Sequence, residues 1–491
     1  MTGLARSEIR DSDIIALADR VSREGYRKYL RRMTLVKIRG FNDRRVSFDF
    51  PVTALIGPNG GGKTTVLGAA GIIYQSVPPR LFFAKSGKYD RSMQDWIVEY
   101  DVIDRDLARS NPQRTASFRR AKWNRTALAR EVRVFGISRT VPASERRDLV
   151  KAVGSRFTAK SETELDPAVV TAAERVLGKP MTGYASLTVD SAGKITLYAV
   201  SAQGGTYSEF HFGAGEASII KIISGIETAP DNSLILIEEI ENGLHPVATQ
   251  RLVEYLVDAA RRKSVQVIFT THSNDALTPL PPSAIWAAYN GELLQGKLDI
   301  RALRTITGQV EAQLAIFVED DFAELMVATA LRQVDNIELD AIKIHGMGGA
   351  VPARTVNHQH NVDPTRTFDS ICILDGDQTA DHSDNVFVLP GTTYPENYVF
   401  DNILTNIDPL AAKLTVMLGL RVEQQEWVKE VVKDRALTNI DRHMIFEQIG
   451  EDLGFLAGLV VKNAFLTLWA QNSQDARDMV APFLDRLPLR S

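Results

Sequence analysis

Short apolar runs alternate with longer stretches of helical periodicity along most of the chain. The first runs, at residues 52–56, 234–237 and 265–269, contain no charged residue, which is typical of strands buried on both faces of a parallel sheet. A second series follows, with apolar runs at residues 314–318, 342–344, 370–374 and 386–389. After about residue 400 the periodicity is mostly helical. These patterns predict an α/β fold with two strand-and-helix regions and a helical C-terminal segment.

The segments around the first runs have a different pattern. Alternating positions between residues 35 and 50 predict a hairpin, and further strands are expected at residues 96–103, 132–137 and 187–200, with a charged helical segment between them. Residues 1–32 have a helical pattern with a basic end formed by Arg27, Lys28, Arg31 and Arg32. This extension is expected to dock by an apolar face formed by Ile14, Leu17, Ala18 and Val21, or else to contact phosphates or a second subunit.

The composition is that of an ordinary globular protein. Of 491 residues, 44% are hydrophobic and 24% are charged, and 57 basic against 61 acidic side chains leave a net charge of −4. This balance does not mark the whole chain as a nucleic-acid binder, but it leaves room for a local basic stripe. Residues 114–133 carry Phe118 and Trp123 among basic residues that include Arg119, Arg120, Lys122, Arg125 and Arg130. This segment forms either a phosphate-tracking surface or a solvated helix.

Several features predict a cytoplasmic protein that does not contact a membrane. The first residues do not have the pattern of a signal peptide. The apolar residues 455–470 include Lys462 and are too few for a membrane span, so we expect a buried helix. The single cysteine, Cys372, cannot form an internal disulfide, which is typical of a reducing compartment.

A glycine-rich loop follows the first apolar run. Residues 57–64 match the pattern G-x-x-x-x-G-K-[ST] between a predicted strand and a predicted helix. The glycines let backbone N–H groups point at phosphate oxygens, and the helix N-terminus adds partial positive charge. Lys63 would bridge the β- and γ-phosphates, and the Thr64 hydroxyl would ligate Mg²⁺. The predicted ATP-binding residues of this loop are Gly57, Pro58, Asn59, Gly60, Gly61, Gly62, Lys63, Thr64 and Thr65.

The next two apolar runs end in candidate catalytic residues. Glu238 and Glu239 directly follow residues 234–237, and we expect Glu238 to hold Mg²⁺ and Glu239 to polarise the attacking water. His272 follows residues 265–269 and resembles the switch histidine that contacts the γ-phosphate in ABC-type ATPases.

With these motifs, residues 34 to about 300 resemble the ABC-type ATPase heads of the RecF, structural-maintenance-of-chromosomes and OLD (overcoming lysogenisation defect) proteins. Residues 240–246, Ile-Glu-Asn-Gly-Leu-His-Pro, look like the loop that follows the acidic strand in these families. The signature segment would be residues 212–216, in which Gly213 stands where serine is usual; Glu238 likewise stands where aspartate is usual. The resemblance implies that Gly213, Gly215 and Glu216 reach the partner's nucleotide in an ATP-bridged homodimer.

Carboxylates gather in the second series of strands. Residues 311–401 contain sixteen Asp and Glu but only four Lys and Arg, which indicates a site for hard cations. The acids follow successive parallel strands, whose carboxyl ends meet at one edge of a sheet. Two Mg²⁺ or Mn²⁺ ions there could activate a water and stabilise the leaving oxygen of a phosphodiester. With Thr64 and Glu238 of the nucleotide site, the candidate metal ligands are Glu319, Asp320, Glu324, Asp375, Asp377 and Glu396.

The order of Glu319, the Gly348-Gly349 turn and the Asp375-x-Asp377 pair resembles the TOPRIM domain of topoisomerases, primases and OLD-family nucleases. The resemblance implies that Glu319, Asp375 and Asp377 are catalytic, as Glu239 and His272 are in the ATPase half, and that Glu396 is a later acid of the same site. Asp320 stands where a glycine is usual. Lys462 either supplies a basic group to this site or interrupts an apolar helix. His358 and His360 lack a convincing third zinc ligand, which favours a polar loop.

The chain is therefore interpreted as similar to OLD-family ATP-dependent endonucleases, including the Gabija-type ATPase–nuclease. The expected organisation is a helical extension (1–33), an ABC-type ATPase domain (34–305), a TOPRIM-like domain (306–405) and a helical region (406–491), with coupling through residues 300–315. The resemblance implies cleavage of nucleic acid, with DNA favoured over RNA, in anti-phage defence alongside a possible second protein. The alternative is an ATP-gated nucleic-acid clamp or sensor whose acidic domain docks or controls a separate effector.

Overall fold

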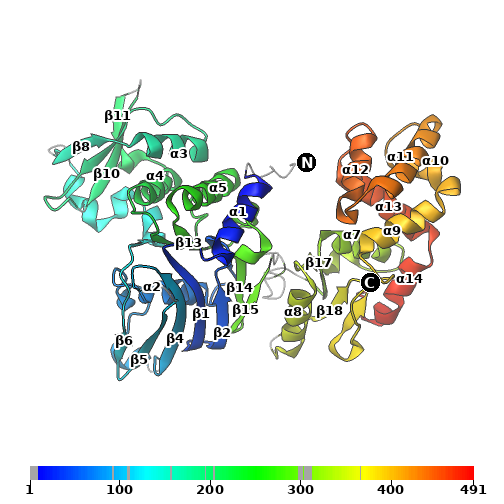
Figure 1. Cartoon of the computed structure of the whole chain (residues 1–491), viewed down its shortest axis with the longest axis horizontal. Helices are drawn as coiled ribbons and strands as arrows, with labels where there is room; N and C mark the ends of the chain where they lie inside the picture. The colour runs from blue at the N-terminus through cyan, green and yellow to red at the C-terminus, as the bar shows by residue number, and fades with distance from the viewer. Residues whose placement is uncertain are drawn as a thin grey trace. The chain divides into compact units, whose positions relative to one another are not determined.

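The computed structural model describes residues 9–90, 93–107, 111–154, 157–193, 195–202, 205–296, 302, 312–364 and 366–490 (Figure 1). The chain divides into two units, Met1–Ile300 and Arg301–Ser491. The expected domain boundary at residue 305 and most of the expected coupling segment, residues 300–315, lie outside the described residues.

A six-stranded sheet forms the centre of the first unit. Its order is β15-β14-β3-β13-β12-β7, in which β14, β3, β13, β12 and β7 are parallel and β15 pairs antiparallel to β14. The predicted apolar runs form its middle strands, and every residue of these strands is buried, as expected for a sheet covered on both faces. The strand bounds are β3 (Val52–Ile56), β7 (Val132–Phe135), β12 (Leu234–Ile237), β13 (Gln266–Thr270), β14 (Ile285–Tyr289) and β15 (Glu292–Gln295).

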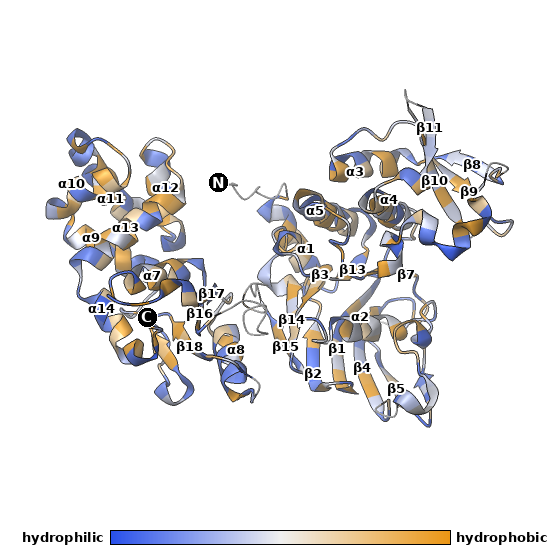
Figure 2. Ribbon diagram, turned by 180° about the vertical axis from the view of Figure 1, so that it is seen from behind, coloured by the Kyte–Doolittle hydropathy of each residue, from blue (hydrophilic) through white to orange (hydrophobic). Residues whose placement is uncertain are grey.

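Helices cover both faces of this sheet (Figures 1 and 2). On one face α2 (Lys63–Ile72) packs in a core with Leu55, Leu236 and Ile268. On the other face lie α4 (Ala214–Glu227) and α5 (Pro246–Lys263). The mixed α/β architecture predicted from the sequence is confirmed.

A second, antiparallel sheet packs against α2 through the same core. Its order is β2-β1-β4-β5-β6, and the expected strand at 96–103 is β4. The bounds are β1 (Lys28–Ile38), β2 (Phe41–Ser47), β4 (Trp96–Asp104), β5 (Gln113–Arg119) and β6 (Lys122–Arg125).

The N-terminal extension is shorter than the helical pattern predicted. Helix α1 (Asp11–Ser22) ends well before residue 32, and the expected boundary at residue 33 falls inside β1. The prediction of a basic helix end was wrong, because β1 pairs with β4 over these residues. Their charges are partly met by nearby acids: Arg27 and Lys28 contact Asp106, at 2.6 and 3.1 Å.

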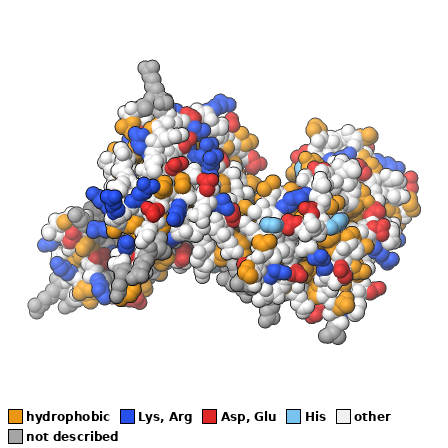
Figure 3. Space-filling view, turned by 90° about the horizontal axis from the view of Figure 1, so that it is seen from below, with side chains coloured by type: hydrophobic (Ala, Val, Ile, Leu, Met, Phe, Trp, Pro, Cys, Tyr) orange, Lys and Arg blue, Asp and Glu red, His pale blue; other side chains and the backbone are white. Residues whose placement is uncertain are grey.

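The basic segment at residues 114–133 is not a helix but mainly the β5–β6 hairpin. Phe118 and Trp123 pack on each other, with ring centroids 5.4 Å apart, and on Trp96. Phe118 belongs to the core of this unit, and Trp123 is partly buried against that core. On the face seen in Figure 3, Lys and Arg side chains lie in separate groups interrupted by other residues.

A small third sheet lies between β7 and α4 in the sequence. Its antiparallel order is β11-β10-β9-β8. The single strand expected at 187–200 is instead a hairpin, whose turn is fixed by Asp190 Oδ1 accepting from the Ile195 N–H at 2.7 Å. The bounds are β8 (Ser161–Glu164), α3 (Pro167–Leu177), β9 (Tyr184–Thr188), β10 (Thr196–Ala202) and β11 (Gly205–Ser208).

The second unit is built on a four-stranded parallel sheet of order β17-β16-β18-β19. The four predicted apolar runs are its strands. Their bounds, with the helices that connect them, are β16 (Leu314–Val318), α7 (Asp321–Leu331), β17 (Ile342–Gly346), α8 (Ala350–Val362), β18 (Asp369–Leu374) and β19 (Val386–Val388).

The helical C-terminal region is confirmed and shares one core with this sheet. Its helices are α9 (Pro395–Thr405), α10 (Ile407–Met417), α11 (Gln425–Thr438), α12 (Ile445–Asp452), α13 (Gly458–Asn472) and α14 (Asp475–Val480). The buried helix predicted for residues 455–470 is found in part: α13 buries Val461 and most residues from Ala464 to Ala470, whereas Phe455, which precedes the helix, and Leu459 are exposed. Among the described residues, no helix has both the length and the apolar character that crossing a membrane requires.

Candidate functional site

The glycine-rich loop connects the end of β3 to the first residue of α2. Gly57 and Gly62 have φ values of +146° and +105°, which side chains strongly disfavour. A Cβ at Gly57 would lie 2.3 Å from the Ala288 carbonyl oxygen, and one at Gly62 would lie 2.4 Å from Cζ of Phe41. Glycine is therefore required at both positions, and the helix N-terminus faces the loop as a phosphate site needs.

Lys63 folds back over this loop. Its Nζ donates to the carbonyl oxygens of Gly57 and Pro58, at 2.9 and 3.0 Å. Burial lowers the pKa of the Lys63 ammonium to about 8, although the nearby carboxylates of Glu239 and Glu241 act in the opposite direction. Lys63 of the loop is therefore within electrostatic reach of the carboxylates that follow β12.

The affinity for ATP is expected to decrease as the pH rises through about 8. A neutral Lys63 cannot attract phosphate oxygens, and the protonated fraction of a group with a pKa of about 8 falls about tenfold between pH 7 and pH 9. Titration with a fluorescent ATP analogue at constant Mg²⁺ should show a comparable loss of affinity. Lys63→Met should bind weakly without this loss, and an equal pH dependence in both proteins would contradict the assignment.

Glu238 and Glu239 follow β12 directly, and Glu239 is held by several hydrogen bonds. Its N–H donates to Thr270 Oγ1 at 2.8 Å, and its Oε2 accepts from Asn242 Nδ2 at 2.6 Å. Its φ of +44° is unusual for a residue with a side chain. The surrounding bonds therefore fix a Glu239 conformation that the backbone alone would not favour.

His272 is placed through Glu241, a residue to which the sequence analysis gave no role. Glu241 accepts from the His272 N–H at 2.6 Å and from Thr271 Oγ1 at 2.7 Å. The loop after β12 thus fixes the residues after β13. The loop motif at residues 240–246 contains Glu241 and Asn242, but only the fold shows which groups these two residues contact.

The candidate signature residues lie at the start of α4. Gly213 is the N-cap of this helix, and a Cβ at Gly215 would lie 2.0 Å from the Gly243 carbonyl oxygen. Glu216 contacts Lys179 Nζ at 2.8 Å and accepts a hydrogen bond from Tyr184. Thr65 is also engaged within the chain, since its Oγ1 accepts from Arg39 at 2.9 Å. Thr64 is exposed at the first turn of α2.

Residues 139–278 match a family model described as "AAA domain, putative AbiEii toxin, Type IV TA system". The matched residues include α4, β12 and β13, with Glu238, Glu239 and His272. No curated protein matches the chain. The chain therefore carries an AAA-type ATPase domain, and a domain of this type implies ATP and a divalent metal ion.

Similar solved structures include SMC head domains and the recombination mediator protein RecF with ATP. The SMC head domain from Thermotoga maritima is 13% identical, with a TM-score of 0.35, and the match covers 55% of this chain and 99% of that chain. The SmcHead bound to the C-winged helix domain of ScpA is 12% identical, with a TM-score of 0.38 and coverages of 54% and 96%. The RecF–ATP structure is 10% identical, with a TM-score of 0.33 and coverages of 55% and 99%. At these scores the likeness carries no conclusion about function.

In the second unit, Glu319, Asp375 and Asp377 follow the carboxyl ends of β16 and β18, whereas Glu324 lies on α7 and Glu396 on α9. The Asp375 N–H, just after β18, donates to Glu319 Oε1 at 2.9 Å, just after β16. A Cβ at Gly376 would lie 2.5 Å from the Gly391 carbonyl oxygen, so the Asp-Gly-Asp turn requires its glycine. The two strand ends that the sequence predicted to meet are thus in contact.

The carboxylates near Asp375 destabilise its charged form. Burial raises the pKa of Asp375 to about 8, with further contributions from Glu319, Asp320, Glu396 and Asp377. Burial also raises the pKa of Glu319, assisted by the charges of Asp377 and Asp320. Asp375 Oδ1 and Glu396 Oε2 are buried and have no hydrogen-bond partner. We refer to Glu319, Asp320, Asp375, Asp377 and Glu396 as the carboxylate cluster.

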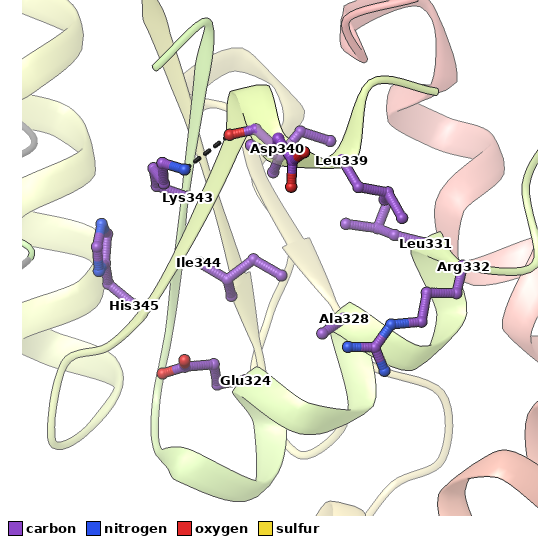
Figure 4. Close-up of a pocket in the computed structure, with 10 residues that line it drawn as sticks. Glu324, Ala328, Leu331, Arg332, Leu339, Asp340, Lys343, Ile344 and His345 are labelled. Atoms are coloured by element: carbon purple, nitrogen blue, oxygen red, sulfur yellow. Dashed lines mark hydrogen bonds between the residues drawn. The ribbon is translucent and has the colours of Figure 1, made fainter. Parts of the chain in front are cut away.

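Two members of the predicted ligand set have other contacts. Asp320 caps α7, since its Oδ1 accepts from the N–H groups of Phe322 and Ala323, both at 2.9 Å. Glu324 Oε2 accepts from the Gly346 N–H at 3.3 Å, and Glu324 lines a separate cavity of about 510 Å³ between α7 and β17 (Figure 4). In the part of the chain that the structure describes, no three His, Cys, Asp or Glu side chains are arranged to hold a metal ion.

The helical region adds a residue to the cluster that the sequence analysis missed. His443 Nδ1 lies 3.0 Å from Glu396 Oε1, and this hydrogen bond raises the pKa of the His443 imidazole. Residues 396 and 443 are far apart in sequence and no motif connects them. Lys462, by contrast, forms an ion pair with Glu447 at 2.8 Å. His358 lies on α8 and contacts Asp384, while His360 is buried beside Phe368, so the expected polar loop is a helix.

Asp375→Asn is expected to stabilise the metal-free chain increasingly as the pH rises. A carboxyl with a pKa near 8 in the folded state and near 4 when unfolded binds more protons in the folded state between these values. The wild type therefore loses stability as the pH rises from about 4 to about 8, and the amide does not. At about 1.4 kcal/mol per pH unit, the variant should gain about 4 kcal/mol at pH 8.5 relative to pH 5. Urea denaturation in EDTA measures this difference, and a gain that is independent of pH would contradict it.

Proposed function

We propose that this chain is an ATP-dependent, metal-dependent nuclease of the OLD type, in which the ATPase domain controls a phosphodiester-cleaving site at the carboxylate cluster. The observation that carries the proposal is the buried Asp375, surrounded by four other acids and left with an unpartnered oxygen. Buried carboxylate charge needs a counter-charge, and hard oxygen ligands suit Mg²⁺ or Mn²⁺.

In the ATPase half, the chain's own groups suit phosphate binding and water activation. Lys63 and the backbone N–H groups of the loop, from Asn59 to Thr64, would bind the phosphates. The exposed Thr64 hydroxyl and Glu238 would hold Mg²⁺. Glu239 would orient the attacking water, because Asn242 and Thr270 hold it in place. His272 would contact the γ-phosphate.

In the second unit, Glu319, Asp375 and Asp377 would hold the catalytic ions, with Glu396 as a further ligand or as the partner of His443. Bound ions would supply Lewis acidity and an activated water. The unpartnered oxygens of Asp375 and Glu396 fit such ions chemically. Asp320 would act mainly as the helix cap, and Glu324 is the member of the predicted set with the least support.

We also propose that the residues Gly213, Gly215 and Glu216 engage ATP bound to a second copy, so that the chain works as a homodimer or larger assembly. Nucleic acid is the proposed substrate, DNA before RNA, and phage defence with a second protein the proposed setting. Plasmid DNA, single-stranded DNA and RNA incubated with Mn²⁺, with and without ATP, test the activity. Cleavage of any of them that EDTA abolishes supports the proposal.

One observation favours the alternative of an ATP-gated clamp or sensor. Among the described residues, the carboxylates do not form a site with three metal ligands. A surface that docks another protein would not need such a site. This alternative predicts ATP-dependent retention of nucleic acid in a gel-shift assay without any cleavage in Mg²⁺ or Mn²⁺. The two assays on one preparation separate the functions.

A further inference from the structure

Arg139 is a buried cation behind the acidic strand, and no sequence motif marks it. Its side chain is 7% exposed and follows β7, the strand that pairs with β12. Its Nη1 donates to the carbonyl oxygens of Glu238 at 2.6 Å and Gly136 at 3.0 Å. Its Nη2 donates to the Glu239 carbonyl oxygen at 2.7 Å, and its Nε donates to Ser218 Oγ at 3.0 Å.

These contacts join two parts of the ATPase domain through one side chain. Nη1 and Nη2 bond to the backbone carbonyl oxygens of Glu238 and Glu239, the candidate catalytic acids. Nε bonds to Ser218 of α4, which follows the candidate signature residues 213–216. A guanidinium presents five N–H groups in a planar fork, whereas an ammonium has three donors at one point. Lysine at this position could not reproduce the three directions.

Helix α4 meets the same loop at a second point. The backbones of Gly215 and Gly243 are so close that a Cβ on Gly215 would overlap the Gly243 carbonyl oxygen. The first turns of α4 therefore rest on the loop that contains Glu239, Glu241 and Asn242. A displacement of α4 would therefore change this contact and the Arg139–Ser218 hydrogen bond.

Glu239 is the residue most sensitive to such a displacement. Its φ of +44° is maintained by neighbouring bonds, and the Arg139 bond to its carbonyl oxygen is one of them. Misplacing a catalytic group by about 1 Å can cost about 10²-fold in rate.

We propose that Arg139 is a positioning residue that couples α4, and so the segment at residues 213–216, to the placement of Glu239. When a second copy's nucleotide engages the start of α4, the position of Arg139 changes the orientation of the attacking water in this chain's own site. The inference rests on the proposed ATP hydrolysis. It adds that Arg139 is the group that links the position of α4 to the position of Glu239.

Arg130 provides a matched control at the opposite end of the same strand. It is also 7% exposed and donates to the carbonyl oxygens of Asn232, at 2.8 Å, and Ser233, which precede β12. Arg139→Lys and Arg130→Lys each keep the positive charge but replace a buried guanidinium with an ammonium group. The two variants should therefore lose similar thermal stability.

Steady-state ATP hydrolysis distinguishes positioning from general stability. Arg139→Lys should lower kcat about 10²-fold with KM for ATP within about threefold, while Arg130→Lys keeps kcat within about twofold. Ser218→Ala should lower kcat in the same direction by a smaller factor. Equal losses of kcat in the two lysine variants, or wild-type kcat in both Arg139→Lys and Ser218→Ala, would overturn the inference.

Hydrogen–deuterium exchange gives a readout that does not depend on turnover. Arg139→Lys should speed amide exchange both at residues 239–242 and at residues 214–218, and Arg130→Lys should leave both segments unchanged. Unchanged exchange in Arg139→Lys would overturn the coupling even if the wild type proved inactive. An inactive wild type with the expected exchange pattern would instead refute the proposed hydrolysis.

Discussion

Glu239→Gln is expected to abolish ATP hydrolysis while leaving ATP binding intact. The amide preserves the shape of the side chain and can still contact Asn242, but it cannot accept a proton from the attacking water. General bases typically contribute 10²–10⁴-fold, so kcat should fall by about 10³-fold. Phosphate release and nucleotide binding, measured on the same preparation, check both parts of this expectation.

Glu131→Gln is the control for this variant. Glu131 directly precedes β7, at the other end of the sheet, where its carboxylate contacts Arg133 at 3.3 Å. Hydrolysis by this variant should equal that of the wild type. If Glu239→Gln retained more than about a tenth of the wild-type rate, another residue would have to be the base.

Asp375→Asn is expected to abolish metal-dependent cleavage of nucleic acid without unfolding the chain. The substitution removes the most perturbed charge of the carboxylate cluster, and the amide oxygen is a much weaker ligand for a hard cation. Cleavage should fall by at least about 10³-fold, a loss typical of removing a principal electrostatic contribution. The same variant should hydrolyse ATP normally, because the proposed ATP site lies in the other unit, Met1–Ile300.

The matched control is Asp369→Asn, at the first residue of the same strand β18. Asp369 is exposed and contacts Arg366 at 3.0 Å. Its variant should cleave like the wild type in Mn²⁺. Equal cleavage by Asp375→Asn and the wild type would remove the nuclease site from this cluster.

Much of the fold could be predicted because buried parallel strands leave a clear sequence signal. Residues 52–56 and 234–237 became β3 and β12 with the same bounds, since no strand exposed on one face could be wholly apolar. The hairpin expected at residues 35–50 is formed by the end of β1 and by β2. The start of β1 and the whole of β5 were missed because their polar residues on one face resemble those of a solvated helix. Arg31 and Arg32 illustrate this, since only pairing with β4 decides their conformation.

The candidate site residues also divide into those that belong to a local sequence motif and those that only the fold places. Lys63, Glu239 and Asp375 could be named as candidates because each belongs to a short motif that follows a buried strand. Arg139 and His443 could not, since their roles depend on neighbours about 79 and 47 positions away, Ser218 and Glu396. Asp320 was predicted as a ligand because it is acidic, yet it caps α7; the sequence pattern does not distinguish these uses of a carboxylate.

We propose that one chain combines a nucleotide site with a divalent-metal site at the ends of β16 and β18. Anomalous diffraction from crystals grown with Mn²⁺ and a slowly hydrolysed ATP analogue tests it most directly. We expect Mn²⁺ at the nucleotide, beside Thr64, and further Mn²⁺ bound to carboxylate oxygens of Glu319 and Asp375. Mn²⁺ at the nucleotide with no anomalous peak at Asp375 would contradict it, because the first peak shows that the crystal was loaded.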